Sequence, residues 1–274
     1  MEELRTEAER RGIDVHVLEA GEDPAELVAQ AISNGAGAIG MAGGDGSLGP
    51  VAGVAVEHGV PVVTIPFGTR NHFARDLGLD PEDPLAALAA FEGREQAVDV
   101  GTVDGRTFLN NVSLGIYGSF VHDPARKTRN RVLTGLRMAP AALGRSRSPL
   151  QLSFDGEGNG EQHAALIVLV ANNAYRLESM SELGERESLD EGLLYAYVVE
   201  AVSRRTLLAL LLRAALGRTQ QAEGLVELQA RRFTLRAERP QVRAAIDGEP
   251  AQLGSPLEFE LRPRALRVLL PGSS

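Results

Sequence analysis

The sequence contains no cysteine and no tryptophan, and only 4% of its residues are aromatic. Without cysteine the chain can form no disulfide, thiol nucleophile or zinc–thiolate site. Scarce aromatic side chains argue against nucleic-acid binding by base stacking, and a formal net charge of −9 argues against binding driven by overall charge. We therefore expect no nucleic-acid partner.

Long apolar runs are also missing from the sequence. Residues 207–212 are apolar but end at Arg213, far short of the ~20 residues that span a bilayer. The first residues are charged, so no signal peptide is visible. Together with the absence of cysteine, this favours a protein of the reducing cytoplasm.

The first hundred residues alternate between strand and helix patterns. With 274 residues, 43% of them hydrophobic, one large or two medium domains are expected. Strands are predicted at 13–18, 36–42 and 60–65, and helices at 23–33, from about 48 to 58 with Pro50 in the first turn, and at 84–91. Repeated strand–helix units predict a doubly wound parallel sheet, an α/β nucleotide-binding domain.

The pattern changes to short strands after about residue 97. Asp104-Gly105 is a strong hairpin signal. Strands are predicted at 96–103, 106–114, 150–154, 163–171, 193–199, 225–227, 233–236 and 242–246, with helices near 132–143 and 203–216. This spacing predicts an antiparallel β-rich sandwich domain over 99–264. The last strand, 266–270, is expected to return to the first domain, which would then comprise 1–98 and 265–274.

Two glycine-containing loops follow predicted strands of the first domain. The first reads Gly43-Gly44-Asp45-Gly46-Ser47, and its glycines allow the backbone to approach a phosphate at the start of the next helix. The second reads Pro66-Phe67-Gly68-Thr69-Arg70-Asn71-His72-Phe73-Ala74-Arg75. Each loop alone is equally typical of a tight turn or of a strand-to-helix connection.

The two loops together resemble those of the diacylglycerol kinase catalytic-domain family, which includes bacterial soluble lipid kinases and sphingosine kinases. Its pattern is G-G-D-G-T followed about twenty residues later by P-x-G-T-x-N-D-F-A-R, and residues 48–65 separate the two loops here. Further matches lie at 98–101 (VDVG), 188–194 (SLDEGLL) and 245–250 (AIDGEP). NAD kinases and phosphofructokinases share the first loop but not the second loop and the late D-G-E.

The resemblance implies transfer of the ATP γ-phosphoryl group to a lipid hydroxyl, with diacylglycerol as the default lipid, in phospholipid metabolism. It implies that Asp45 meets Mg²⁺, that Glu249 is the general base, and that Asp99 works with Glu249. The residues that it implies for ATP binding are Gly43, Gly44, Asp45, Gly46, Ser47, Gly68, Thr69 and Asn71. From the residues alone, Asp247-Gly248 is also typical of a hairpin turn, and Asp99 of a capping carboxylate.

The sequence departs from the family pattern at three places. His72 replaces the aspartate of N-D-F-A-R, and Arg186 stands where some members have an acidic residue near a structural magnesium. The strand and the N-P-x-S-G loop that open the family's domain are not found before residues 1–11, so we expect part of the ATP site to be missing. A non-catalytic nucleotide- or lipid-binding protein, and an NAD kinase, therefore stay open.

One basic segment stands out in this acidic chain. Residues 124–154 contain no Asp or Glu, and their basic residues are Arg126, Lys127, Arg129, Arg131, Arg137, Arg145 and Arg147. Basic clusters bind anionic membranes at about 1 kcal/mol per residue; the alternative is a solvated helix. We hypothesise that Arg126, Lys127, Arg129 and Arg131 dock the protein peripherally on the inner membrane face. A homodimer is left open.

Overall fold

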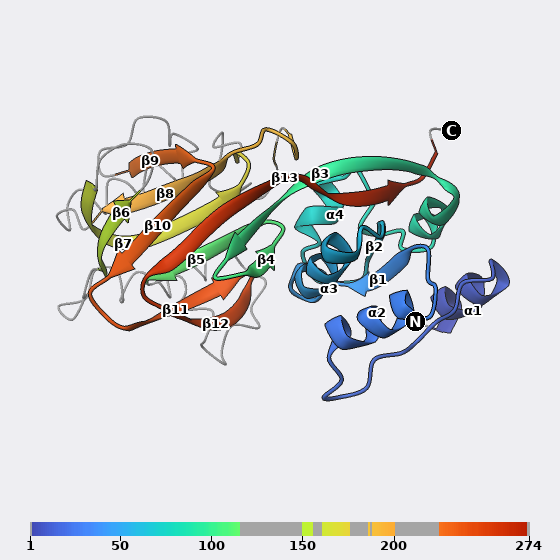
Figure 1. Cartoon of the computed structure of the whole chain (residues 1–274). Helices are drawn as coiled ribbons and strands as arrows, with labels where there is room; N and C mark the ends of the chain where they lie inside the picture. Colours follow the sequence, from blue (N-terminus) through green and yellow to red (C-terminus); the bar gives the residue numbers. More distant parts are fainter. Residues whose placement is uncertain are drawn as a thin grey trace. The chain divides into compact units, whose positions relative to one another are not determined.

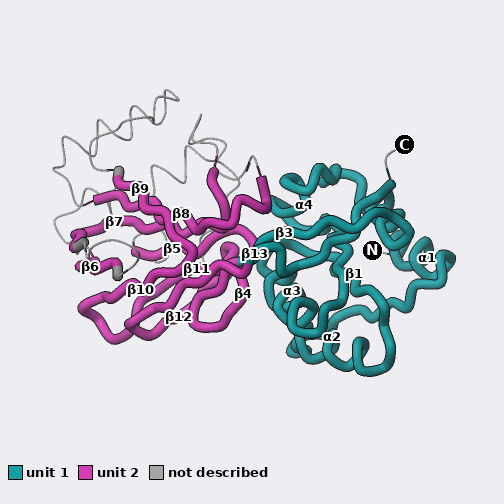
Figure 2. Tube along the Cα trace, turned by 45° about the horizontal axis from the view of Figure 1, so that its top comes forward, with its two compact units in different colours: residues 1–100, 263–274 teal, residues 101–262 magenta. Residues whose placement is uncertain are grey.

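The computed structural model describes residues 2–115, 150–155, 161–175, 186, 188–200 and 225–272. The chain splits into two compact units, residues 1–100 with 263–274 and residues 101–262 (Figure 2). The helices predicted at 132–143 and 203–216 lie outside the described residues, as do the four docking residues between 126 and 131.

The first unit is an α/β layer structure with a parallel sheet (Figure 1). Strand β1 pairs in parallel with β2, and the end of β13 pairs in parallel with the other edge of β2, placing Val268 opposite Val62. The parallel sheet predicted from the strand–helix alternation is thus confirmed. Its elements are α1 (Glu2–Arg10), α2 (Pro24–Ser33), β1 (Ile39–Gly43), α3 (Asp45–His58), β2 (Val62–Pro66), α4 (His72–Asp76), the 3-10 helix η1 (Ala86–Glu92), and parts of β3 (Arg94–Val103) and β13 (Leu257–Leu270).

Strand β2 is buried along its whole length, as a central parallel strand should be. Val63 and Ile65 point to one face, where they pack with apolar residues of α1 and η1. The apolar stripe of α3, which includes the fully buried Val51 and Ala55, packs against β1 and β2, and α2 packs against α3. Helices therefore position both strand ends that carry the glycine loops.

Helix α2 confirms its predicted signals, because Asp23 Oδ1 accepts a hydrogen bond from Ala25 N at 2.9 Å and Pro24 is the first helical residue. Three other predictions were wrong. Residues 13–18 form no strand; they have no strand partner among the described residues, and Val17 is 50% exposed. Residues 86–92 form a 3-10 helix, and Pro50 is the sixth residue of α3 because the helix already begins at Asp45.

The second unit is antiparallel, as the short-strand pattern predicted. Pairing runs from the start of β13 through β10, β6, β7, β5 and β11 to β12, and β8 and β9 continue from the other edge of β7. Its remaining strands are β4 (Arg106–Phe108), β5 (Asn111–Gly115), β6 (Leu150–Asp155), β7 (Glu161–Asn172), β8 (Leu194–Glu200), β9 (Leu225–Ala230), β10 (Arg232–Ala237), β11 (Gln241–Ile246) and β12 (Glu249–Gly254).

An aromatic row anchors the core of this second unit. The Phe233 and Phe259 rings stack with centroids 5.0 Å apart, and Phe108 meets Phe259 edge-on at 6.5 Å. Aliphatic side chains from the facing strands surround them. In the part of the chain that the structure describes, no helix is long and apolar enough to cross a membrane.

Candidate functional site

The two glycine loops meet backbone to backbone in the first unit. Phe67 N donates a hydrogen bond to Gly43 O at 3.1 Å, just past the last paired residues of β1 and β2. A Cβ atom on Gly68 would lie only 2.5 Å from Gly44 Cα. Close approach of the two loops therefore requires glycine at position 68, and it brings together motifs that the sequence places more than one helix apart.

Asn71 holds the second loop in shape. Its backbone is left-handed, with φ of 51°, a conformation in which asparagine is tolerated better than most residues. Oδ1 accepts a hydrogen bond from Gly68 N at 2.8 Å, and Nδ2 donates to Gly68 O at 3.0 Å. Because Asn71 is only 6% exposed, these contacts make it a residue that shapes the loop around Gly68.

Asp45 connects the first loop to the second. Its Oδ2 accepts a hydrogen bond from His72 N at 3.0 Å, and its Oδ1 accepts one from Phe73 N at 2.9 Å. The carboxylate thereby satisfies two N–H groups at the start of α4, which have no partner inside a helix. Asp45 is also the first residue of α3, so one side chain ties two helix starts together.

The outer part of both loops is open to solvent. Ser47, Gly68, Thr69 and Arg70 are exposed, whereas Asn71 is buried beneath them. Helix α3 begins at Asp45, and its first turn carries the partial positive charge of a helix N-terminus. The predicted loop residues Gly43, Gly44, Asp45, Gly46, Ser47, Gly68, Thr69 and Asn71 thus belong to one cluster within the first unit.

Asp99 is buried on β3 in the same unit, at 1% exposed. Its Oδ1 accepts a hydrogen bond from Arg264 N at 2.7 Å. The carboxylate therefore ties β3 to the strand β13 that returns to the first unit. This contact matches the capping role that the residue type alone suggested.

Glu249 lies in the second unit, at the start of β12. Asp247 and Gly248 form the two-residue turn before it, with φ of 46° and 86°, and the turn places Ile246 opposite Glu249. Positive φ at both turn positions is typical of a type I′ hairpin. Glu249 is exposed and leads an edge strand that the sequence pattern missed.

Asp247 also has a structural role that the sequence pattern did not predict. Its carboxylate accepts three backbone hydrogen bonds, from Leu109 N and Asn110 N at 2.8 Å each and from Asn111 N at 3.0 Å. The turn before Glu249 is thereby attached to the chain that enters β5. These partners are more than 130 residues away in sequence, so no local signal could have revealed them.

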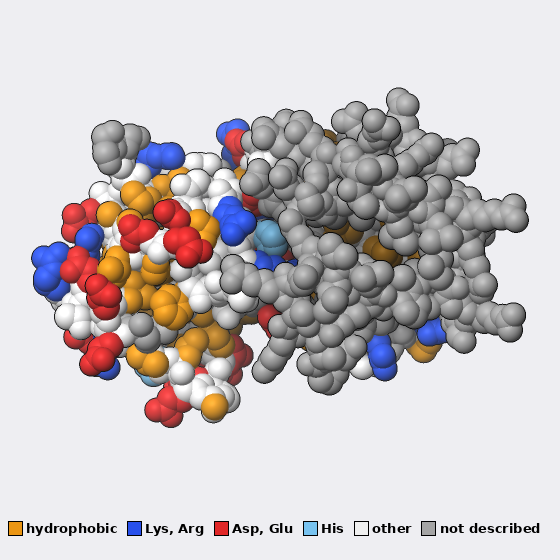
Figure 3. Space-filling view, turned by 180° about the vertical axis from the view of Figure 1, so that it is seen from behind, with side chains coloured by type: hydrophobic (Ala, Val, Ile, Leu, Met, Phe, Trp, Pro, Cys, Tyr) orange, Lys and Arg blue, Asp and Glu red, His pale blue; other side chains and the backbone are white. Residues whose placement is uncertain are grey.

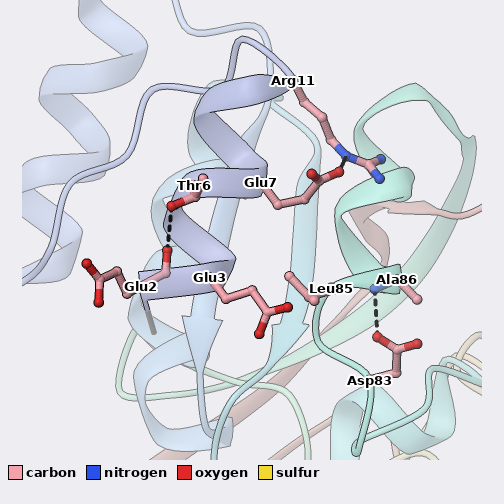
Figure 4. A pocket seen from close by; sticks show the side chains of 8 residues that line it. All are labelled: Glu2, Glu3, Thr6, Glu7, Arg11, Asp83, Leu85 and Ala86. Atoms are coloured by element: carbon pink, nitrogen blue, oxygen red, sulfur yellow. Dashed lines mark hydrogen bonds and ion pairs between the residues drawn. The ribbon is translucent and has the colours of Figure 1, made fainter.

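A groove between α1 and η1 shows what a phosphate site would not look like. Its lining includes the carboxylates of Glu2, Glu3, Glu7 and Asp83 (Figure 4). Arg11 donates to Glu7 at 2.7 Å, and the hydrogen bonds from Arg10 and Arg11 lower the pKa of Glu7 to about 2. A lining of ionised carboxylates repels nucleotide phosphates, and none of the predicted site residues lies there.

The described surface of the first unit mixes charges of both signs. On the face in Figure 3, acidic and basic side chains alternate around a band of hydrophobic ones. Four large hydrophobic residues are exposed in the described ranges: Val15, Val17, Leu18 and Phe67. Such a mixed surface does not resemble the basic stripe of a nucleic-acid-binding domain.

Comparison with known proteins matches this arrangement over the whole chain. Residues 1–103 match the model for the diacylglycerol kinase catalytic domain, and residues 85–270 match that for the YegS C-terminal NAD kinase beta sandwich-like domain. The chain belongs to the YegS-like family of lipid kinases. Membership rests on both halves and confirms the expected α/β plus β-sandwich fold.

Curated relatives agree with this assignment. A Pseudomonas fluorescens protein named "Probable lipid kinase YegS-like" is 32% identical over the whole chain and 92% of its own length. A Mycobacterium tuberculosis protein named "Diacylglycerol kinase" is 28% identical over 95% of this chain and 86% of its own. The chain is accordingly an enzyme of the lipid kinase class, with a lipid substrate.

Solved structures show the same fold at lower identity. A Bacillus anthracis protein described as a "putative diacylglycerol kinase" superposes with a TM-score of 0.73 at 20% identity, covering 98% of this chain and 90% of that one. A second diacylglycerol kinase from the same organism gives a TM-score of 0.64 at 16% identity, covering 93% of this chain and 84% of that one.

Proposed function

We propose that this lipid kinase uses ATP and Mg²⁺ to phosphorylate diacylglycerol, yielding phosphatidic acid and ADP. The observation that carries the proposal is the contact between the two glycine loops, because it places small residues and open N–H groups around one exposed surface at the start of α3. Preorganised N–H donors and a helix N-terminus are suited to bind phosphates.

In this proposal the glycines of the first loop, together with Gly68, contact the phosphates through their backbone. The exposed hydroxyl groups of Ser47 and Thr69 donate hydrogen bonds to phosphate oxygens. Asn71 acts through Gly68, since its amide is bonded to that residue at both ends. Asp45 keeps α3 and α4 together while its remaining lone pairs face a cation.

The residues present are compatible with Mg²⁺. In the described part of the chain no cluster of three or more metal-binding side chains occurs, but Mg²⁺ usually keeps several waters and takes one or two carboxylates plus substrate phosphates. Asp45 would be the protein ligand, and a bound Mg²⁺ would neutralise charge on the phosphates. Each Asp45 oxygen accepts only one printed backbone hydrogen bond, which leaves acceptor capacity for such a role.

Glu249 is our candidate for the general base. Its carboxylate would take the proton from the lipid hydroxyl as that oxygen attacks the γ-phosphorus, and the bond from the γ-phosphorus to the bridging oxygen would break to release ADP. Asp99 is assigned a supporting role with Glu249 only by resemblance. A positioned base contributes about 10²–10⁴ in rate.

Glu249→Gln tests this assignment. Wild-type protein is incubated with labelled ATP, Mg²⁺ and a panel of diacylglycerol, phosphatidylglycerol, sphingosine and NAD. We expect label on diacylglycerol, a fall in kcat of at least about 100-fold in Glu249→Gln, and unchanged ATP affinity. Glu238→Gln is the matched control, since Glu238 is an exposed glutamate of the same unit.

The possible outcomes separate the alternatives. Wild-type-like kcat in Glu249→Gln would remove Glu249 from the mechanism. Binding of ATP without transfer to any acceptor would favour a non-catalytic homologue, and label on NAD would favour an NAD kinase. Label on sphingosine or phosphatidylglycerol alone would keep the reaction and replace the substrate.

We also propose that the basic segment binds the anionic inner face of the cytoplasmic membrane. The proposal rests on its sequence, because seven basic and no acidic residues occur between 124 and 154. Reversing Arg126, Arg129 and Arg131 to Glu should abolish sedimentation with phosphatidylglycerol vesicles and leave activity on detergent-dispersed lipid intact. Unchanged sedimentation would refute it.

A further inference from the structure

Arg186 is a buried cation inside the second unit whose contacts are with oxygen atoms of the polypeptide. It is 8% exposed. Nη1 donates to Leu109 O at 2.6 Å and to Asn172 O at 2.9 Å, and Nη2 donates to Asn110 Oδ1 at 2.9 Å. Three oxygens from the ends of β5 and β7 thus surround one guanidinium group.

The same short segment contacts the carboxylate of Asp247 on its N–H side. Leu109 O, which accepts from Arg186, and Asn110 N, which donates to Asp247, belong to one peptide group. That peptide group therefore lies between a cation at its oxygen and an anion at its N–H. Both charges are aligned with the peptide dipole, and hydrogen bonds in such a chain polarise and strengthen one another.

Further bonds make this link rigid. Asn172 Nδ2 also donates to Leu109 O at 3.1 Å, and Asn172 N donates to Asn110 O at 3.0 Å. Asp247 N in turn donates to Asn111 O at 2.9 Å. The segment 109–111 is held by these contacts on both its carbonyl and its N–H sides.

We propose that Arg186 is a positioning residue for Glu249. It fixes segment 109–111, the segment fixes the Asp247 carboxylate, and Asp247 with Gly248 forms the turn that presents Glu249. Arg186 need not contact the substrate or the nucleotide for this effect. The inference rests on the proposed role of Glu249 as general base.

Lysine is a poor replacement for this arginine. A guanidinium offers five N–H donors in a planar fork, whereas an ammonium group is a compact point charge with three donors. Arg186→Lys should therefore keep the buried charge but lose the simultaneous contacts to the Leu109 and Asn110 oxygens. Misplacing a catalytic group by 1 Å costs about 100-fold in rate, so a fall in kcat of about 10–100-fold is expected.

The test compares Arg186→Lys, Arg186→Ala and the control Arg243→Met, which removes an exposed arginine on β11. We expect lower kcat with unchanged KM for ATP in both Arg186 variants, and wild-type kinetics in the control. Millimolar guanidinium should restore part of the rate in Arg186→Ala and none in Glu249→Gln. In the Glu249→Gln background, Arg186→Lys should cause no further loss, because both changes act on one group.

Hydrogen exchange tests the link independently of activity. Amides of 109–111 and 247–249 should exchange faster in both Arg186 variants than in wild type or the Arg243 control. If the wild type transfers no phosphoryl group, the proposed function fails, but this exchange result still decides whether the link exists. Should Arg186→Ala not fold, Arg186→Lys decides: a folded lysine variant with unchanged kcat and exchange would overturn the proposal, as would additive losses with Glu249→Gln.

Discussion

Gly68→Ala tests whether the two glycine loops need their close contact. The added methyl group would lie 2.5 Å from Gly44 Cα and 2.7 Å from Asn71 Oδ1. Neither neighbour can yield easily, since the first is backbone and the second is held by its bonds to Gly68. Overpacking of this kind costs about 1–3 kcal/mol, and the loops must separate to relieve it.

Two measurements follow that separation. Urea unfolding monitored by circular dichroism should show the loss of stability, and calorimetric titration should show weaker ATP binding. Gly37→Ala is the control, because a Cβ there meets nothing within 4 Å. Gly44→Ala should destabilise less than Gly68→Ala, since its Cβ would sit at an ordinary 3.5 Å from Gly68 Cα. A Gly68→Ala protein that matches Gly37→Ala in both measurements would refute the argument.

Three further predictions concern the same two units. Asp45→Ala leaves two N–H groups of α4 without their acceptors and should lower the free energy of unfolding by about 1–2 kcal/mol, measured in urea. Asn71→Ala loses both bonds to Gly68 at a left-handed φ and should cost about 1–3 kcal/mol in the same assay, while an unchanged value would exclude the shaping role. Burial raises the pKa of Tyr197 to about 12 and is also the main cause of the pKa of about 12 for Tyr195. Since the unfolded chain ionises near pH 10, the stability due to these neutral tyrosines is complete below that pH and is lost between pH 10 and 12; tyrosinate absorbance in Tyr197→Phe should lack one late-titrating group.

The turns could be predicted from the sequence because they depend on a few residues with distinctive backbone preferences. Asp104 and Gly105 adopt φ of 48° and 76° between β3 and β4, as expected for a two-residue hairpin. The glycine loops were found for the same reason. In each case the residue types alone restrict the backbone, and no distant contact needs to be known.

Strand 13–18 was predicted wrongly because apolar alternation is only half of what a strand requires. Val15 and Val17 alternate with polar residues, but both are exposed, at 37% and 50%. A strand also needs hydrogen-bonding partners, which the described residues do not supply to this segment. The error shows that period alone cannot locate the edge of a sheet.

The charged network around segment 109–111 could not be predicted because its partners are remote. Arg186 reaches Leu109 across 77 residues, and Asp247 reaches it across 138. The sequence drew attention to Asp247 only through its turn and to Arg186 only as a departure from the family pattern. Their common partner becomes apparent only when β5, β7 and β11 lie side by side.

Asp45 and Asp247 perform the same structural task in different units. Each precedes a glycine, and each carboxylate accepts backbone N–H groups of a distant segment. Loss of activity on replacing either aspartate would therefore mix a folding effect with a chemical one. Glu249 differs, because it is exposed at the start of an edge strand and its replacement by Gln should leave the fold intact. A large loss of kcat without loss of stability at Glu249, but not at the two aspartates, is what distinguishes the reacting carboxylate from those that hold the loops in place.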